Sequence, residues 1–391
     1  MSRIDQLAAD PAIEALHSKL TANLPHIIEE AITIQQISAP TFQEGQRAAY
    51  VYERFTGLAD LQIDSVHNVY ARLPGTNPTL PAVLLAAHTD TVFAADAILT
   101  IQRQNGRVYG PGIGDNSLGV AAVLSMADLL RQQSLESDIW FVANSREEGM
   151  GDLGGMRAVY EKLMPRLGLA LILEGMAYGH IYRSGIAVRR LKITCKTGGG
   201  HSWLHYGRPS AIHTLMRIGA AITQLTPPQE PRTTFNIGVI EGGQSVNSIA
   251  TTASMLLDMR SEERDTLADL EQQVRHIIDQ QRIPDVEIVV EVVGDRPSGS
   301  IALTHPLVQL ARDVLRWQGI HPVYETGSTD ANVLLAAGLP SITIGVTHGG
   351  NAHRLDEYIE TAPIRDGLWQ LLLLTIAAAN GLASKLGLPL R

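Results

Sequence analysis

The feature that most constrains the fold of this chain is a set of acidic and histidine residues placed just after strand-like apolar runs. Residues 83–87 run directly into His88, and residues 171–173 end at Glu174. Apolar runs without polar alternation are typical of parallel strands that are buried on both faces. Ligands bind in the crevice outside the carboxyl ends of such strands, so we expect these polar side chains to share one site.

The same arrangement recurs twice more along the chain. Residues 139–143 lead to the pair Glu147-Glu148, and residues 342–346 lead to His353. Two histidines and several carboxylates delivered to one sheet edge suit a zinc-type hydrolase.

The order of helix-like and strand-like segments predicts two domains, as does the length of 391 residues. Residues 1–183 alternate helix and strand, which predicts a mostly parallel sheet with helices on its faces. Residues 184–298 give the β-α-β-β-α-β order of a ferredoxin-like domain. Residues 299–391 return to the α/β pattern. We therefore expect an α/β catalytic domain in two segments with a small domain inserted between them.

Two helices can be predicted in more detail. Residues 25–37 are expected to form a helix with Pro25 in its first turn, where a proline is tolerated. Residues 117–132 are apolar nearly all round, which predicts a helix buried against the sheet.

Composition narrows the class of protein. The net charge of −9 argues against a nucleic-acid partner, because phosphate binding rests on an excess of Lys and Arg. The single cysteine, Cys195, excludes an intrachain disulfide framework. Residues 1–20 read as an amphipathic helix rather than a secretory leader, and no window has the uninterrupted apolar length of a membrane span. We expect a cytoplasmic enzyme without a membrane partner.

His88 and Asp90 belong to one extended segment. Side chains alternate along a strand, so these two point to the same face. One can bind a metal while the other orients it. The structural alternative is a turn that contains an incidental histidine and aspartate.

Asp115 follows the glycine-rich turn of residues 110–114. A phosphate-binding loop is one alternative, but the glycine spacing does not match the dinucleotide fingerprint, and no Lys-Ser/Thr follows as in a P-loop. We favour Asp115 as an oxygen ligand of a metal. A plain loop with an aspartate capping the next helix is the structural alternative.

Glu147 and Glu148 are adjacent carboxylates that repel each other unless a cation lies nearby. Beside a divalent metal, one can ligate while the other acts as a general base. Neighbouring side chains point in different directions, which makes this division natural. A solvated pair of surface glutamates is the structural alternative.

The remaining candidates are one carboxylate and three histidines. Glu174 directly ends an apolar strand and needs a partner if it is buried. His353 is preferred as a ligand over its rival His348. His201 lies in the inserted domain, where it could donate a hydrogen bond to a developing oxyanion. Two histidines and three carboxylates as ligands, with one free glutamate, together match a two-metal site with a bridging aspartate and an activated water.

The order H-x-D, D, E-E, D/E, H resembles the dizinc metallopeptidase and amidohydrolase family that includes carboxypeptidase G, aminoacylase, peptidase T and succinyl-diaminopimelate desuccinylase. The resemblance covers almost the whole chain, from His88 to Glu357. It implies a zinc-exopeptidase-like catalytic domain whose inserted domain is a lid and, in many members, a dimer interface.

The resemblance also implies roles for individual residues. One zinc would be held by His88, Asp115 and Glu174, and the other by Asp115, Glu148 and His353. Glu147 would be the general base and acid, and Asp90 would orient His88. The substrate-binding residues implied by the resemblance are His201, Asn247, Arg260, Gly327 and Ser328.

Glu174 narrows the expected reaction. In the family, a glutamate at this position accompanies carboxypeptidases and acylases, whereas an aspartate more often accompanies aminopeptidases. We therefore expect a hydrolase that cleaves the amide bond of a small peptide or N-acyl amino acid with two Zn²⁺, or with Co²⁺ or Mn²⁺ in their place. The alternatives are a di- or tripeptide aminopeptidase and a catalytically inactive binding protein on the same fold.

Overall fold

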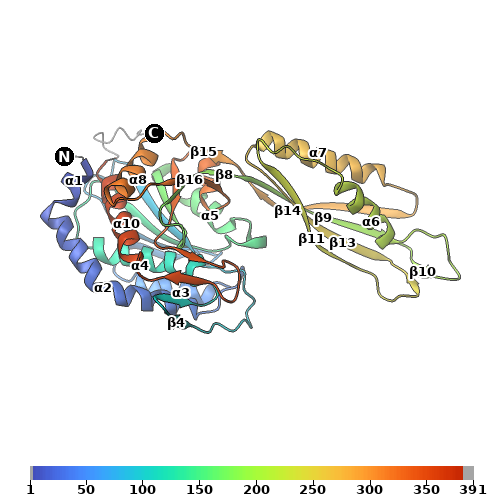
Figure 1. The fold of residues 1–391 in the computed structure, drawn as a ribbon, viewed down its shortest axis with the longest axis horizontal. Coiled ribbons are helices and arrows are strands. Elements are labelled where there is room, and N and C mark those ends of the chain that lie inside the picture. The colour runs from blue at the N-terminus through green and yellow to red at the C-terminus, as the bar shows by residue number, and fades with distance from the viewer. Residues whose placement is uncertain (1–2, 382–391) are drawn as a thin grey trace. The chain divides into compact units, whose positions relative to one another are not determined.

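The computed structural model describes residues 3–381 and divides into two compact units (Figure 1). The first unit comprises Met1–Gly185 and Gly299–Arg391, and the second comprises Ile186–Ser298. Each unit has its own hydrophobic core.

The first unit is built around a sheet with the strand order β1-β2-β6-β3-β7-β17-β8-β15, in which β16 also pairs with β8. The central strands β6 (Ile139–Asn144), β3 (Ala82–His88), β7 (Leu167–Leu173) and β17 (Ser341–Ile344) run parallel to one another. The flanking strands are β1 (Ala59–Ile63), β2 (Val69–Leu73), β8 (His180–Gly185), β15 (Gly299–Ser300) and β16 (Val323–Gly327). The expected mostly parallel sheet is confirmed.

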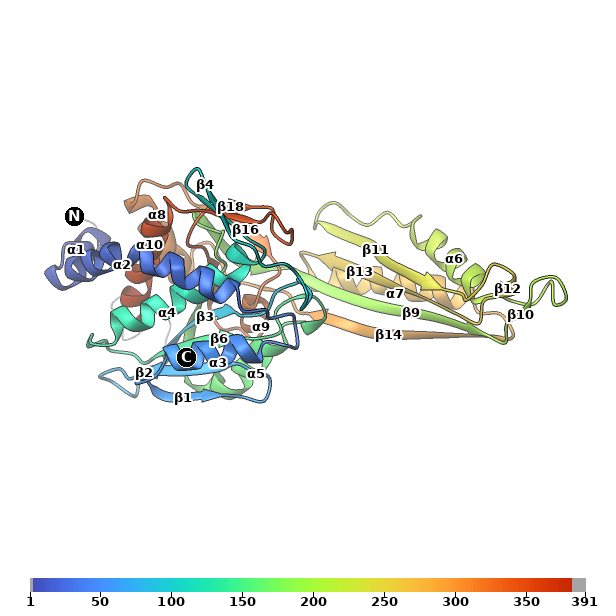
Figure 2. The ribbon, with the colours of Figure 1, turned by 90° about the horizontal axis from the view of Figure 1, so that it is seen from below.

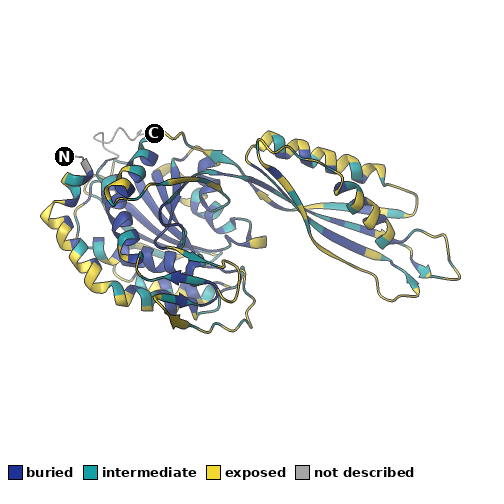
Figure 3. Ribbon diagram, in the orientation of Figure 1, coloured by how far each residue is buried: buried dark blue, intermediate teal, exposed yellow. Residues whose placement is uncertain are grey.

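Helices cover both faces of this sheet. Successive side chains of a strand point to opposite sides, so each central strand contributes apolar side chains to two cores. Val83 and Leu85 of β3 join one core, whereas Leu84 and Ala86 join the other. Figure 3 shows the central strands in the dark blue of buried residues. The first core is closed by α1 (Arg3–Ala8), α2 (Pro11–Gln35), α3 (Gly45–Arg54), α4 (Leu118–Leu130), α8 (Pro306–Trp317) and α10 (Ile364–Ala379). The second is closed by α5 (Gly154–Leu163) and α9 (Ala331–Ala336).

The helix α2 begins much earlier than the sequence predicts. Asp10 caps it by accepting a hydrogen bond from the N–H of Ala12 at 2.8 Å, and Pro11 occupies the first turn. Pro25 therefore lies inside the helix, and its predicted first-turn position is wrong. Burial of Leu20 and Ile27 on either side of Pro25 shows how packing overrides local propensity. The sequence also predicts a last helix over residues 362–384, of which residues 382–384 lie outside the described residues.

The stretch Ile113–Leu130 is long and apolar enough to cross a membrane by composition alone, with a mean hydropathy of 1.2. It consists of the irregular turn η1 (Ile113–Ser117) followed by α4, and 83% of it is buried inside the protein. Burial of this kind is typical of a core helix, as predicted for this segment.

A small antiparallel sheet lies beside the central one, in the order β18-β19-β5-β4. Figure 2 shows it where β4 and β18 are labelled. Its strands are β4 (Gln102–Gln104), β5 (Arg107–Tyr109), β18 (Gly349–Gly350) and β19 (Tyr358–Glu360). It joins a segment just before Asp115 to the segment that carries His353.

The second unit is a four-stranded antiparallel sheet in the order β11-β13-β9-β14, with two helices packed on one face. Its elements are β9 (Ala187–Thr197), α6 (Ala211–Ile222), β11 (Thr233–Gly242), β13 (Thr252–Ser261), α7 (Arg264–Gln280) and β14 (Val286–Arg296). Two short strands, β10 (Gly200–His201) and β12 (Ser248–Ile249), pair with each other outside this sheet. Short 3-10 turns complete the chain at η2 (Gly149–Gly151) and η3 (Met164–Arg166), both in the first unit.

Candidate functional site

The parallel strands of the first unit deliver the candidate ligands to one edge of the sheet. His88 is the last residue of β3, and Glu174 follows β7 directly. Glu148 stands four residues after the end of β6. Asp115 lies in η1 before α4, and His353 lies in the loop between β18 and β19.

Asp115 stands between the two histidines. Its Oδ1 atom is 3.1 Å from Nε2 of His88, and its Oδ2 atom is 3.0 Å from Nε2 of His353. One carboxylate thus presents a separate oxygen to each imidazole ring. This arrangement places two groups of ligand atoms side by side with Asp115 common to both.

Each group contains a further carboxylate. Oε2 of Glu174 is 3.7 Å from Nε2 of His88, and Oε1 of Glu148 is 3.3 Å from Nε2 of His353. Ligand atoms of His88, Asp115 and Glu148 also lie within 4.8 Å of one another, so these three could hold a metal ion.

The spacing of the donor atoms fits zinc. Ligands at about 2.0–2.2 Å from a tetrahedral zinc ion are about 3.3–3.6 Å apart. The four contacts of histidine nitrogen with carboxylate oxygen span 3.0–3.7 Å around these values. Imidazole and carboxylate are also common zinc donors, so the residues present fit the metal in both chemistry and spacing.

The electrostatics of the group reflect its concentration of charge. Burial acts to lower the pKa of His88, but Glu174, Asp115 and Asp90 outweigh it and raise that pKa well above its ordinary value. Hydrogen bonds to Asp115 and Glu148 raise the pKa of His353 to about 10. The carboxylates therefore stabilise positive charge on the two histidines. A divalent cation would supply positive charge at the same place.

Two of the carboxylates respond to this environment in opposite directions. Burial raises the pKa of Glu174 to about 7, although the neighbouring His88 acts against it. Burial also acts to raise the pKa of Asp115, but hydrogen bonds with His353 and His88 hold it well below its usual range. Of these two carboxylates, Asp115 is therefore the more firmly ionised.

Asp90 is fully buried, and its carboxylate holds the Glu147-Glu148 pair by the backbone. Its Oδ1 accepts the N–H of Glu147 at 2.9 Å, and its Oδ2 accepts the N–H of Glu148 at 2.9 Å. The hydroxyl of Thr41 donates to the same Oδ2 at 2.8 Å. Nδ1 of His88 lies 3.1 Å from the carbonyl oxygen of Asp90 and 3.6 Å from its Oδ1. Asp90 thus contacts the backbone of Glu147 and Glu148 in addition to His88, the partner that the sequence predicts.

Glu147 lies at the same edge with 5% of its surface exposed. Its backbone is fixed by Asp90, and Glu148 beside it points its carboxylate toward His353. Glu148 therefore contacts His353, whereas Glu147 is buried beside it.

Sequence reasoning missed the buried cation that supports this edge. Arg47 of α3 is 1% exposed and donates to the carbonyl oxygens of Ile37 and Thr89, both at 2.7 Å. Its charge faces Asp90, while burial lowers the pKa of the guanidinium to about 10. The only local signal is that Arg47 adjoins Ala48 and Val51, which form the apolar side of α3.

Two other predictions concern loops near the site. The ring of His348 lies 5.5 Å from the ring of Tyr178, whereas Nε2 of His353 lies 3.0 Å from Asp115 and 3.3 Å from Glu148. Gly327 ends β16 and Ser328 follows it. Asp330, two residues later, accepts a hydrogen bond from Nδ2 of Asn144 at 2.7 Å, which ties this turn to the end of β6.

The other three candidate substrate-binding residues belong to the second unit. His201 is exposed in β10, and its Nδ1 accepts the N–H of Trp203 at 3.2 Å. The backbone carbonyl oxygen of Asn247 accepts a hydrogen bond from the N–H of Ser202 at 3.0 Å. Arg260 pairs with Asp258 on β13 at 2.7 Å. The pairing of β10 with β12 therefore brings His201 next to Ser248, the residue after Asn247.

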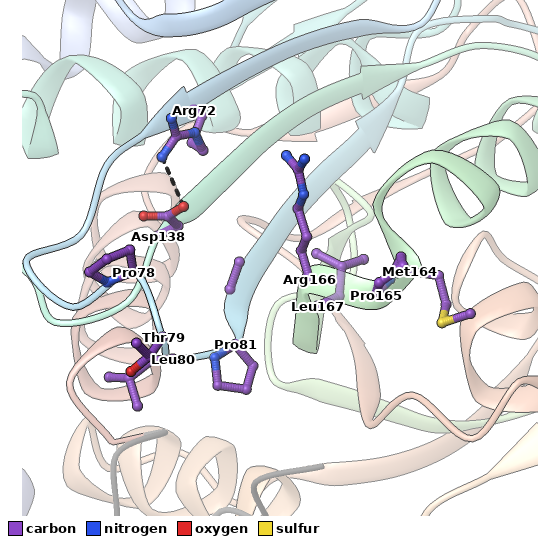
Figure 4. A pocket seen from close by; sticks show the side chains of 11 residues that line it. Arg72, Pro78, Thr79, Leu80, Pro81, Asp138, Met164, Pro165, Arg166 and Leu167 are labelled. Carbon is purple, nitrogen blue, oxygen red and sulfur yellow. Dashed lines mark hydrogen bonds and ion pairs between the residues drawn. The ribbon is translucent and has the colours of Figure 1, made fainter.

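A separate pocket of about 640 Å³ lies at the opposite edge of the central sheet, where the parallel strands begin (Figure 4). Ala82 and Leu167, the first residues of β3 and β7, line it. Its carboxylate, Asp138, is already paired with Arg72 at 2.9 Å. The pocket therefore lacks the donor set found at the carboxyl ends of the strands.

Comparison with known proteins agrees with this geometry. A family model described as "Peptidase family M20/M25/M40" matches residues 84–374. The chain is 26% identical over 325 residues to a succinyl-diaminopimelate desuccinylase of Xylella fastidiosa, covering 75% of this chain and 83% of that protein.

Solved structures share the fold at lower identity. An aminopeptidase PepT of Bacillus cereus is 19% identical with a TM-score of 0.72, covering 93% of this chain and 99% of that one. The YXEP protein of Bacillus subtilis, described as a dinuclear metal binding peptidase from the M20 family, is 16% identical with a TM-score of 0.65, covering 94% and 99%.

Proposed function

We propose that this chain cleaves the amide bond of a small N-acyl amino acid or of a peptide with a free carboxyl end. The chain belongs to peptidase family M20/M25/M40 and is a metal-dependent hydrolase, which supports the proposal. The observation that carries the proposal is the position of Asp115, whose two oxygens face two different histidines. A carboxylate in this position suits a bridge between two metal ions.

The residues that would hold two zinc ions follow from these contacts. His88, Asp115 and Glu174 would hold one ion, and Asp115, Glu148 and His353 would hold the other. When bound, the ions would lower the pKa of a water molecule and polarise the substrate carbonyl. Similarity to a protein described as a dinuclear metal binding peptidase supports a pair of ions rather than one.

Glu147 would do the proton work. It would take a proton from the attacking water and return it to the leaving amine, as a general base and then a general acid. Asp90 supports this role because it fixes the backbone of Glu147 and Glu148 at 2.9 Å each. A general base needs such positioning, since proton transfer requires hydrogen-bond reach.

The second unit would serve as a lid over the substrate and as a dimer interface. In the closed form, His201 would donate a hydrogen bond to the developing oxyanion, and Asn247 and Arg260 would bind the substrate carboxylate. Gly327 and Ser328 of the first unit would contact the substrate from the turn after β16. The exposed side chains of Trp203, Leu204 and Tyr206 next to His201 are consistent with a surface that is covered in use.

The proposed substrate class rests on Glu174 and on similarity to a desuccinylase, an enzyme that releases an acyl group from an amino acid. The test is hydrolysis of paired substrates by the zinc-loaded protein. We expect cleavage of N-acyl amino acids and N-blocked dipeptides, and weaker cleavage of dipeptides with a free amine. Cleavage of free-amine substrates alone would identify an aminopeptidase instead.

A matched variant distinguishes this chemistry from simple binding. Glu147→Ala should retain two zinc ions and lose turnover by about 10²–10⁴-fold, the usual contribution of a general base. Full activity in this variant would rule out the assigned mechanism. Zinc content measured on the same sample shows whether a loss of activity reflects lost metal.

A further inference from the structure

Glu357 is a buried carboxylate that contacts the backbone of the proposed bridging ligand. Its side chain has no exposed surface, and it precedes β19 in the same loop that carries His353. Its Oε1 atom accepts the N–H of Gly114 at 2.8 Å and the N–H of Asp115 at 2.9 Å. Glu357 and Asp115 are 242 residues apart in the sequence, so this contact joins two distant segments of the first unit.

Backbone pairing places Glu357 at the junction of these segments. The strand after it, β19, pairs with β5 on one side and with β18 on the other. The carbonyl oxygen of Glu357 accepts the N–H of Gly110 at 2.8 Å, and its own N–H donates to the carbonyl oxygen of Arg354 at 3.1 Å. The chain on either side of Glu357 is thereby fixed to the turn before Asp115 and to the loop of His353.

We propose that Glu357 is a positioning residue that orients Asp115 toward His353 and thereby sets the affinity of the site for metal. The inference rests on the proposed function, because it assigns Asp115 and His353 as ligands. Hydrogen bonds from two successive backbone N–H groups to one carboxylate oxygen fix the peptide planes on which Asp115 is mounted. The carboxylate of Asp115 can then direct Oδ2 to His353, 3.0 Å away, while Oδ1 faces His88.

A purely structural role explains the geometry of Glu357 less well. Within residues 3–381, its Oε2 atom is buried and has no hydrogen-bond partner. Burying a carboxylate oxygen without a partner is unfavourable for folding. A neutral glutamine could accept the same two hydrogen bonds without burying a charge. Burial raises the pKa of Glu357 to about 7, so burial by itself disfavours an ionised carboxylate at this position.

The experiment measures zinc affinity by competition with a chromophoric chelator, using the full chain freed of metal and then titrated. Groups that orient metal ligands typically contribute 10–100-fold to metal affinity. We expect Glu357→Ala to weaken binding of at least one zinc ion by about 10–100-fold. Glu357→Gln should bind zinc more tightly than Glu357→Ala, because its amide oxygen can accept the same two hydrogen bonds.

Glu360→Gln is the matched control. Glu360 lies on β19 as well, but its carboxylate is partly exposed and pairs with Arg107 at 2.8 Å. We expect this control to bind zinc as the unaltered protein does. An equal loss in Glu360→Gln would overturn the proposal, because it would show that any change on β19 disturbs the site.

Thermal unfolding of the metal-free proteins shows whether the variants fold. If Glu357→Ala does not fold, Glu357→Met replaces it, because methionine keeps the volume of the side chain and removes the acceptor. An affinity of Glu357→Met equal to that of the unaltered protein then overturns the proposal. If Glu357→Ala folds and binds zinc with unchanged affinity, the proposal is also wrong. Failure of the unaltered protein to bind two zinc ions would instead contradict the proposed function, so the two failures can be told apart.

Discussion

The two histidines of the candidate site have the same side chain and very different support. His88 ends a central strand, its side chain is 2% exposed, and its second ring nitrogen faces Asp90. His353 is 54% exposed, lies in a loop of exposed residues and has a positive φ of 65°. The core of the sheet therefore orients one half of the site, whereas a small peripheral sheet orients the other. Two candidate ligands of the same site thus differ in how strongly the fold constrains them.

The strongest test of this comparison removes the residue that both halves share. Asp115→Ala should abolish binding of both zinc ions and lower turnover by about 10⁴-fold, because metal activation of water and carbonyl contributes several kcal/mol. Zinc content and turnover of the purified variant are the measurements. Asp128→Ala, on the exposed side of α4, is the control and should retain both ions. Two zinc ions in Asp115→Ala would contradict a shared ligand.

A direct comparison of the halves uses His88→Ala and His353→Ala. Each variant should bind one zinc ion fewer than the unaltered protein. His88→Ala should also lower the free energy of unfolding of the metal-free protein, by about 1–3 kcal/mol, since it leaves buried polar groups without a partner. His353→Ala should lower that free energy by about 1 kcal/mol or less, because its side chain is 54% exposed and its ion pairs are partly screened by solvent. Equal destabilisation in urea unfolding would show that the two halves are supported alike.

A smaller effect is expected when one of the hydrogen bonds that hold the backbone of Glu147 and Glu148 is removed. Asp90→Asn replaces one of the two acceptor oxygens by an amide donor, so the N–H of Glu147 or Glu148 loses its partner. We expect kcat to fall by about 10–100-fold, as for other groups that orient ligands. Asp138→Asn is the control at the opposite edge of the sheet, where Asp138 accepts the N–H of Gly75 at 2.7 Å. Similar losses of kcat in both variants would contradict a specific role for Asp90.

The central strands could be predicted from sequence because their residues are apolar without interruption. Such runs leave little alternative to a strand buried on both faces, and the polar residues at their ends then fall at one edge. This accounts for the placement of His88 and Glu174. Secondary structure that depends on distant packing was harder to predict, as the position of Pro25 within α2 shows.

The contacts that support the peripheral half of the site could not be predicted from the sequence, although His353 itself could be. Strands β18 and β19 contain two and three residues, too few for a periodic pattern. Their pairing with β5 arises only in the folded chain, so nothing local indicates that Glu357 reaches the backbone of Asp115. Arg47 is similar, because an arginine in a short helix usually faces solvent, and only tertiary contacts show that it is buried.

The position of β17 has a consequence for how the protein is made. This strand lies between β7 and β8, although it is synthesised more than 150 residues after β7. A nascent chain that has not reached residue 341 therefore has no strand to join β7 to β8, and it also lacks His353. Non-local pairing of this kind is slow, since loop closure must precede it. The set of candidate ligands is thus complete only after residue 353 has been synthesised, near the end of translation.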